Sequence, residues 1–316
     1  MTGDLAQRQP IILDCDPGHD DALAILLAAA APSLELLAIT TVAGNQTLEK
    51  TTLNARRICT VAGIHGVPIA AGADRPLAHE VRVAAEIHGE SGLDGPAFGE
   101  PQVPLDARQA ADLISELSRS VDGLVLVATG PLTNVATVLA RDPGLAGRLR
   151  RLVLMGGAIG IGNTTPAAEF NIATDAEAAR AVFESGLPIT MVPLEATHHA
   201  LATPEVLARI AAIGTPLAAM TVDLLAFFAT TYRNVFGFDS PPVHDPCAVA
   251  WVIDETQAEF SYGRTVCDVY GVTGRPPNAE VATAVAAERF WDLMIDALAS
   301  YAGEPSDPPY AAQELG

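Results

Sequence analysis

The sequence predicts an α/β fold with an open, mostly parallel β-sheet, helices on both faces and a helical C-terminal part. Short apolar runs with strand composition alternate with longer segments of helical composition as far as Val192. This alternation is typical of parallel sheets, because crossover helices then cover both faces. From about Thr203 onward the pattern is mostly helical. The chain has 316 residues, of which 49% are hydrophobic, so it can bury a large core.

The first element is a strand that leads into a helix. Ile11–Asp14 is a short apolar run, Pro17 and Gly18 break it, and helical composition follows over Asp20–Ala31. The other expected strands are Leu34–Val42, Pro68–Ala71, Leu124–Ala128, Leu152–Met155 and Ile189–Val192. The other expected helices are about Thr47–Ala62, Asp106–Ser120, a segment after Pro131 to about Ala140, and Asp175–Glu184. The result is a Rossmann-like arrangement.

Two long loops interrupt this alternation. Residues 73–105 are irregular and contain HGESGLDGP, and GGAIGIGNTTPAAEFN follows the strand that ends at Met155. Loops this long inside a compact chain are more often functional than not. No repeat or linker divides the chain, so we expect a single domain over residues 1–303 and a C-terminal tail over 304–316.

The charge balance restricts the partners. The formal charge is −20, from 38 acidic and 18 basic residues, and Lys50 is the only lysine. Such a surface repels nucleic acids and anionic membranes, which leaves a neutral small molecule or a cation. The four widely spaced cysteines suggest buried free thiols. Neither a signal peptide nor a membrane-spanning stretch is visible, so we expect a cytoplasmic protein.

Polar residues follow the predicted strands at their carboxyl ends, where parallel sheets bind ligands. They are Asp14 and Asp16, then Asn45 and Thr129, and the strand that ends at Met155 runs into Gly156 and Gly157 at the same edge. The segment DCDPGHDDA places four carboxylates, those of Asp14, Asp16, Asp20 and Asp21, within residues 14–22. A helix cap explains one aspartate, but four together require a neutralising cation. An all-oxygen donor set favours Ca²⁺ or Mg²⁺ over zinc.

A second acidic motif is SPPVHDPCAV, in which His244 and Asp245 precede Pro246. The simple interpretation is an aspartate that caps a helix, with a histidine on the surface beside it. The alternative is a metal ligand with a neighbouring proton donor.

Several further motifs occur in a recognisable order along the chain. After DCDPGHDDA come TTVAGNQT, HGESGLDG, VATGPLTN, LMGGA, GNTTPAAEFNIATD and VHDPCAV. With these motifs the chain resembles the nucleoside hydrolases of the inosine-uridine-preferring type along nearly its whole length. The resemblance implies hydrolysis of the N-glycosidic bond of ribonucleosides such as inosine and uridine to ribose and free base. It also implies a role in nucleoside salvage and a homotetramer or homodimer.

The resemblance implies a role for each matching residue. Asp16, Asp21, Asp245 and the carbonyl of Thr129 would hold Ca²⁺, and Asp16 would act as general base on a calcium-bound water. His244 would donate a proton to the leaving base. Asn45, which we place among the catalytic residues, and Met155 would line the sugar site. The residues expected at the remaining substrate positions are Asp20, Asn171, Asn163 and Glu169 for the ribose, Phe170 close by, and His88 and Tyr232 over the base.

Two other functions remain open from the residues alone. An aspartyl-phosphate phosphatase also begins with DxD after its first strand, but it needs a downstream lysine, and Lys50 comes too early. A calcium-dependent nucleoside-binding protein would keep the ligands without a working base or donor. For the enzyme, the base preference can be broad, inosine-uridine, pyrimidine-biased or purine-biased.

Overall fold

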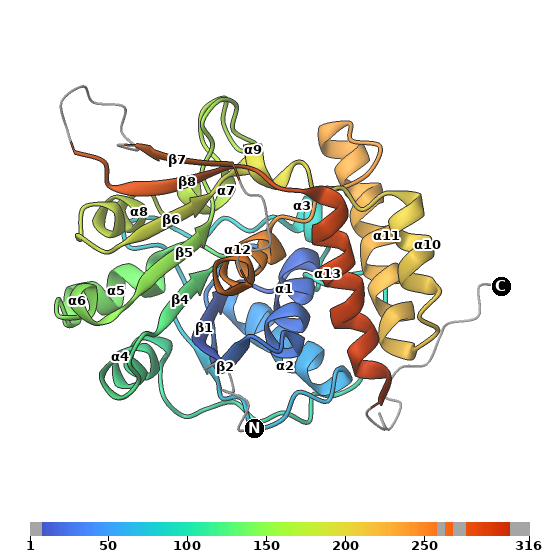
Figure 1. Cartoon of the computed structure of the whole chain (residues 1–316), viewed down its shortest axis with the longest axis horizontal. Coiled ribbons are helices and arrows are strands. Elements are labelled where there is room, and N and C mark those ends of the chain that lie inside the picture. The colour runs from blue at the N-terminus through green and yellow to red at the C-terminus, as the bar shows by residue number, and fades with distance from the viewer. Residues whose placement is uncertain (1–7, 258–262, 268–275, 304–316) are drawn as a thin grey trace, which may run out of the picture.

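The computed structural model describes residues 8–257, 263–267 and 276–303 and contains one eight-stranded sheet (Figure 1). The strand order is β3-β2-β1-β4-β5-β6-β8-β7. The strands are β1 (Gln9–Cys15), β2 (Leu34–Thr41), β3 (Ile69–Ala71), β4 (Val125–Ala128), β5 (Arg151–Met155), β6 (Ile189–Val192), β7 (Gly263–Cys267) and β8 (Ala279–Ala284). Every neighbouring pair is parallel except β7 with β8.

Strand β1 lies inside the sheet, between β2 and β4, so its carboxyl end is flanked on both sides. Asp14 is level with Thr40 of β2 and with Ala128 of β4. The three strands β1, β2 and β4 therefore end at the same edge of the sheet, and the residues that follow them converge there.

Helices cover both faces of this sheet. The helices among the described residues are α1 (His19–Ala30), α2 (Leu48–Val61), α3 (Ala85–His88), α4 (Ala110–Ser120), α5 (Thr133–Arg141), α6 (Leu145–Arg148), α7 (Phe170–Thr174), α8 (Ala176–Phe183), α9 (Leu194–Thr197), α10 (Pro204–Ala211), α11 (Pro216–Phe236), α12 (Asp245–Gln257) and α13 (Ala287–Ser300), with a final 3₁₀ turn, η1 (Tyr301–Gly303).

Side chains that alternate along the strands divide the core into two layers. Ile11 and Leu13 of β1 pack in the layer that includes α1, α2, α12 and α13, with α10 and α11 further out (Figure 1). Ile12 packs in the opposite layer, with α4, α5, α6 and α8. Both faces of β4 and β6, and nearly all of β1 and β5, are buried, which explains the continuous apolar sequences of these strands.

The predicted α/β architecture with a mostly parallel sheet is confirmed, with local corrections. The C-terminal part contains β7 and β8 as well as helices. Helix α4 begins at Ala110 rather than Asp106, because the Asp106 side chain accepts hydrogen bonds from Arg108 and holds a turn. The loop over 73–105 contains α3. The expected tail, 304–316, lies outside the described residues.

Two smaller expectations concern membranes and cysteines. None of the helices among the described residues is long and apolar enough to cross a membrane. Cys15 and Cys59 are buried free thiols, as expected, and Cys247 is buried as well.

Candidate active site

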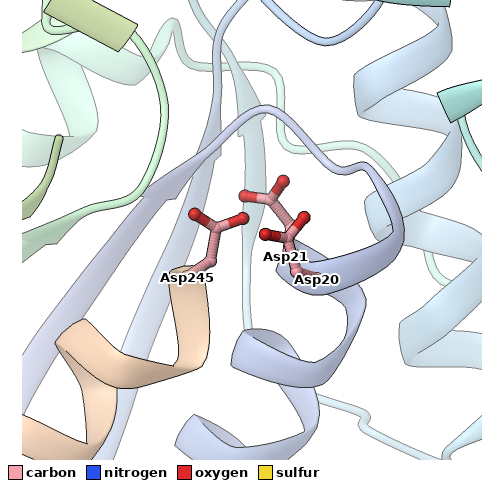
Figure 2. A group of neighbouring side chains, drawn as sticks. All are labelled: Asp20, Asp21 and Asp245. Atoms are coloured by element: carbon pink, nitrogen blue, oxygen red, sulfur yellow. The ribbon is translucent and has the colours of Figure 1, made fainter. Parts of the chain in front are cut away.

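Three buried carboxylates meet where α1 and α12 begin. Asp20 and Asp21 lie in the first turn of α1, and Asp245 is the first residue of α12. One carboxylate oxygen from each lies within 4.8 Å of the others, and all three side chains point into the same space (Figure 2). The beginnings of the two helices explain this placement. Gly18 is the N-cap of α1 and Pro246 lies in the first turn of α12, and both residue types are common at a helix N-terminus. Residues far apart in sequence thus form one acidic cluster.

Asp16 lies beside this cluster, on the turn after β1. Its Oδ2 accepts a 2.7 Å hydrogen bond from the backbone N–H of Asn45, whereas its buried Oδ1 has no hydrogen-bond partner. A Cβ on Gly44 or Gly130 would overlap the Asp16 carboxylate. The two glycines therefore allow the neighbouring loops to close tightly around Asp16.

The remaining oxygens of the cluster accept hydrogen bonds from the surrounding loops. Asp21 Oδ1 accepts from Thr129 Oγ1 at 2.9 Å, and Asp21 Oδ2 accepts from the side-chain amide of Asn45 at 3.1 Å. Asp20 Oδ2 accepts from the backbone N–H of His244 at 3.1 Å. These contacts join the ends of β2 and β4 and the start of α12 to α1.

Burial without a cation makes this cluster electrostatically unfavourable. Burial raises the pKa of Asp20 to about 7, with the charge of Asp21 as the next cause. Burial and the neighbouring carboxylates raise the pKa of Asp16 and of Asp245 well above the usual value. None of the salt bridges between described residues involves these aspartates. A hard divalent cation fits this donor set, including the unpartnered Asp16 Oδ1.

Asp14 lies beneath the cluster and has a different environment. Its Oδ1 accepts hydrogen bonds from Thr40 Oγ1 at 2.6 Å and from Asn134 Nδ2 at 2.7 Å. Burial raises the pKa of Asp14 to about 6, although both hydrogen bonds oppose that shift. Asp14 thus links β1 to β2 and α5.

The loop after β5 supplies a second set of polar groups. Glu169 caps α7 by accepting hydrogen bonds from the backbone N–H groups of Asn171 and Ile172, and it also accepts from Gly157. The side-chain amide of Asn171 donates to the carbonyls of Thr129 and Met155 at 2.8 and 3.1 Å. Asn163 Oδ1 accepts from the backbone N–H of Phe170. This capping geometry holds Glu169 and Asn171 beside the acidic cluster.

A pocket of about 750 Å³ opens above these groups. Its lining includes almost all the residues that the sequence singled out: Asp20, Asn45, His88, Thr129, Met155, Asn163, Glu169, Phe170, Asn171, Tyr232, His244 and Asp245. Asp16 and Asp21 are fully buried beneath it. The pocket therefore joins an acidic floor to a wall of aromatic rings.

Two histidines stand in that wall in different environments. His244 Nε2 lies 2.7 Å from the hydroxyl of Tyr232, and burial lowers the pKa of His244 to about 3, so its ring is neutral. His88 turns its Nδ1 toward His19, whose backbone N–H donates to it at 3.3 Å. A Cβ on Gly18 would overlap the His88 ring, so glycine there permits this approach.

A family model described as inosine-uridine preferring nucleoside hydrolase matches residues 11–292. The chain belongs to this family. It is therefore a ribonucleoside N-glycosidase, and the substrate preference within the family is a separate question.

The names of individual relatives indicate two different preferences. The pyrimidine-specific ribonucleoside hydrolase RihA of Shewanella sp. strain ANA-3 is 48% identical over 93% of this chain and 97% of the relative. RihA of Escherichia coli O8 strain IAI1 is 46% identical over 93% of this chain and 99% of the relative. Among solved structures, the purine-preferring ribonucleoside hydrolase from Gardnerella vaginalis superposes with a TM-score of 0.84 at 28% identity, over 92% of this chain and 98% of that structure.

The compact acidic triad and the metal ligands that the resemblance implies share two residues, Asp21 and Asp245. The compact triad contains Asp20 with Asp21 and Asp245, whereas the resemblance named Asp16 with Asp21 and Asp245. Local sequence patterns did not single out three residues: Phe228, which lines the pocket, His19, whose ring stacks against those of His88 and Phe228, and Thr197, whose Oγ1 lies 2.7 Å from His244 Nδ1. His19 sits inside the DCDPGHDDA motif, which was a signal for it, but nothing in the local sequence marks Thr197.

Proposed function

We propose that this nucleoside hydrolase cleaves the N-glycosidic bond of pyrimidine ribonucleosides, with a calcium ion held by its aspartate cluster. The observation that carries the proposal is the group of buried carboxylates, without a salt bridge among the described residues, at the floor of a pocket with an aromatic wall. The 48% identity to a relative named pyrimidine-specific, against 28% to a structure named purine-preferring, favours pyrimidines.

The chain's own residues would hold calcium through oxygen atoms. We assign Asp16, Asp21, Asp245 and the Thr129 carbonyl as ligands, with Asp20 close enough to bind the ion or a ribose hydroxyl. When bound, calcium would act as a Lewis acid, orienting the ribose diol and lowering the pKa of the attacking water.

Asp16 is our candidate for the general base. Its Oδ1 accepts no hydrogen bond, while the Asn45 N–H holds Oδ2, so Oδ1, which would contact the ion, would also be the oxygen that accepts the proton of the attacking water. The bond between the ribose carbon and the base breaks through a transition state in which the sugar becomes positively charged. Glu169 and the aspartates surround that charge with negative groups.

The ribose and the base would occupy different parts of the pocket. We place the sugar against Asp20, Asn45, Met155, Asn163, Glu169 and Asn171. The base would then lie among Phe170, His88, Tyr232 and His244. Because His244 Nε2 is already bonded to the Tyr232 hydroxyl, we propose that His244 acts on the leaving base together with Tyr232.

The phosphatase alternative has no support from this geometry. Lys50 Nζ pairs with the Glu90 carboxylate at 2.6 Å, and none of the salt bridges between described residues joins it to an aspartate of the cluster. A phosphatase of that class needs its lysine at the aspartates.

The direct test ranks kcat/KM for uridine, cytidine, inosine and adenosine by measuring ribose release. We expect both pyrimidine nucleosides to exceed both purine nucleosides by about tenfold or more, a difference of about 1.4 kcal/mol in transition-state binding. A preference for inosine or adenosine would contradict the pyrimidine assignment. Tight binding of uridine without ribose release would instead support a nucleoside-binding protein.

A further inference from the structure

A chain of hydrogen bonds leads from Thr197 to the wall of the pocket. Thr197 Oγ1 lies 2.7 Å from His244 Nδ1, and His244 Nε2 lies 2.7 Å from Tyr232 Oη. Thr197 is the last residue of α9, is fully buried and does not line the pocket. Its side chain is joined to the pocket lining through His244.

The direction of these hydrogen bonds depends on which acceptor takes the single hydroxyl proton of Thr197. The other acceptor within reach is the Leu194 carbonyl, but that distance is 3.4 Å, at the outer limit of a hydrogen bond. The same carbonyl already accepts from the backbone N–H of His198 at 2.9 Å. His244 Nδ1, at the shorter distance, is therefore the better acceptor.

A proton donated to Nδ1 determines the tautomer of a neutral imidazole. If Nδ1 accepts, Nε2 carries the ring proton and donates it to the Tyr232 oxygen. The hydroxyl proton of Tyr232 is then free to point into the pocket that Tyr232 lines. The opposite tautomer would turn the Tyr232 proton toward His244 and present only an acceptor to the pocket.

We propose that Thr197 is a positioning residue that holds His244 in its Nε2–H tautomer, so that the Tyr232 hydroxyl donates its proton toward the base of the substrate. The part of this proposal that concerns the base rests on the proposed function. In a pyrimidine, the acceptor that such a donor fits is a ring carbonyl oxygen, which gains negative charge as the bond to ribose breaks.

The surroundings keep the Tyr232 proton in place. Burial raises the pKa of the Tyr232 hydroxyl well above its usual value, and the negative charges of Asp20, Asp245 and Glu169 raise it further. Tyr232 therefore stays protonated and can serve as a donor throughout the neutral range.

Two substitutions separate the Thr197 hydroxyl from its packing. Thr197→Val keeps the shape of the side chain but removes the donor, and Thr197→Ser keeps the donor. With uridine we expect Thr197→Val to lower kcat about tenfold with little change in KM, which corresponds to one buried hydrogen bond. Thr197→Ser should keep kcat within about threefold of wild type, because a threefold loss lies at the low end of what one hydrogen bond contributes. With 4-nitrophenyl riboside, whose leaving group needs no proton, both variants should match wild type.

A spectroscopic measurement tests the tautomer without reference to activity. Nitrogen NMR of ¹⁵N-histidine-labelled protein, assigned with His244→Gln, distinguishes a protonated from an unprotonated ring nitrogen. We expect His244 to carry its proton on Nε2 in the wild type and in Thr197→Ser, and a different spectrum in Thr197→Val.

Two results would overturn the inference. One is a wild-type His244 with its proton on Nδ1. The other is an equal loss of activity toward uridine and the nitrophenyl riboside in Thr197→Val, since that indicates a purely structural role. If no nucleoside is hydrolysed but the predicted tautomer is found, the proposed function fails while the positioning role of Thr197 stands.

Discussion

The backbone N–H of Asn45 donates a 2.7 Å hydrogen bond to Oδ2 of Asp16, which leaves Oδ1 as a buried oxygen without a partner. A carboxylate held by one oxygen and free at the other is oriented for use, because its rotation is fixed while one acceptor remains available. The proposed catalytic role of Asp16 depends on this arrangement.

Asp16→Asn should lower kcat on uridine by about a hundred- to ten-thousand-fold, the usual contribution of a general base. The amide cannot accept the proton of water, and it also weakens the binding of a cation. Asp175→Asn is a matched control, since Asp175 is equally buried but caps α8 and accepts hydrogen bonds from Thr133 and Leu77 rather than from residues of the acidic cluster. That control should keep its kcat. Turnover of Asp16→Asn near that of wild type would eliminate Asp16 as the base.

Gly44→Ala should reduce activity by displacing the Asp16 carboxylate. An added Cβ would overlap Asp16 Oδ2 and the ring of Pro131, so the carboxylate must move. Displacement of a catalytic group by about 1 Å costs about a hundredfold in rate. Gly147→Ala is the control, because a Cβ there meets nothing within 4 Å. Equal activity of the two variants, measured as kcat on uridine, would show that the close approach at Gly44 is unimportant.

Calcium should stabilise the protein more at higher pH. Without the ion, burial raises the pKa of Asp20 to about 7 and those of Asp16 and Asp245 well above normal, whereas unfolded aspartates titrate near about 4. A carboxyl group whose pKa is raised by folding stabilises the folded state below about pH 4, and this stabilisation is lost as the pH rises toward about 7. Bound calcium neutralises the charged carboxylates and removes the loss.

Thermal melts at several pH values from 5 to 8, with calcium and with a chelator, measure this effect. The difference in Tm between the two conditions should grow with pH. A shift of constant size, or none at any pH, would contradict the cation site.

2′-Deoxyuridine should be a poor substrate compared with uridine. The carboxylates of Asp20, Asp21 and Asp245 lie together at the floor of the pocket, where the ribose diol would bind. A missing hydroxyl leaves these buried groups unsatisfied, which costs about 2 kcal/mol or more and lowers kcat/KM at least thirtyfold. Comparable kcat/KM values for the two nucleosides would remove the 2′-hydroxyl from the binding model.

The acidic edge of the sheet could be predicted from the sequence because its signals are local. Buried parallel strands appear as apolar runs, and ligands gather at their carboxyl ends, so the order of residues alone was enough to group Asp16, Asn45 and Thr129. Strand β8 was missed because its sequence, AEVATA, is rich in alanine and lies among helical segments.

Contacts between distant segments were beyond prediction from local patterns. The resemblance placed both His244 and Tyr232 at the base, but the bond between them joins the end of α11 to the start of α12. Thr197 reaches His244 across 47 positions of sequence. The close approach at Gly44 likewise depends on how two loops pack, which a glycine in a turn does not reveal by itself.

The most direct test of the account measures uracil and ribose release from uridine by protein depleted of metal, into which calcium is titrated back. We predict no release after depletion and a full recovery that saturates at one calcium ion per chain, with equal amounts of uracil and ribose. Undiminished release by the depleted protein, or no release at any calcium concentration, would contradict the assignment of the aspartate cluster as the calcium centre of a pyrimidine ribonucleoside hydrolase.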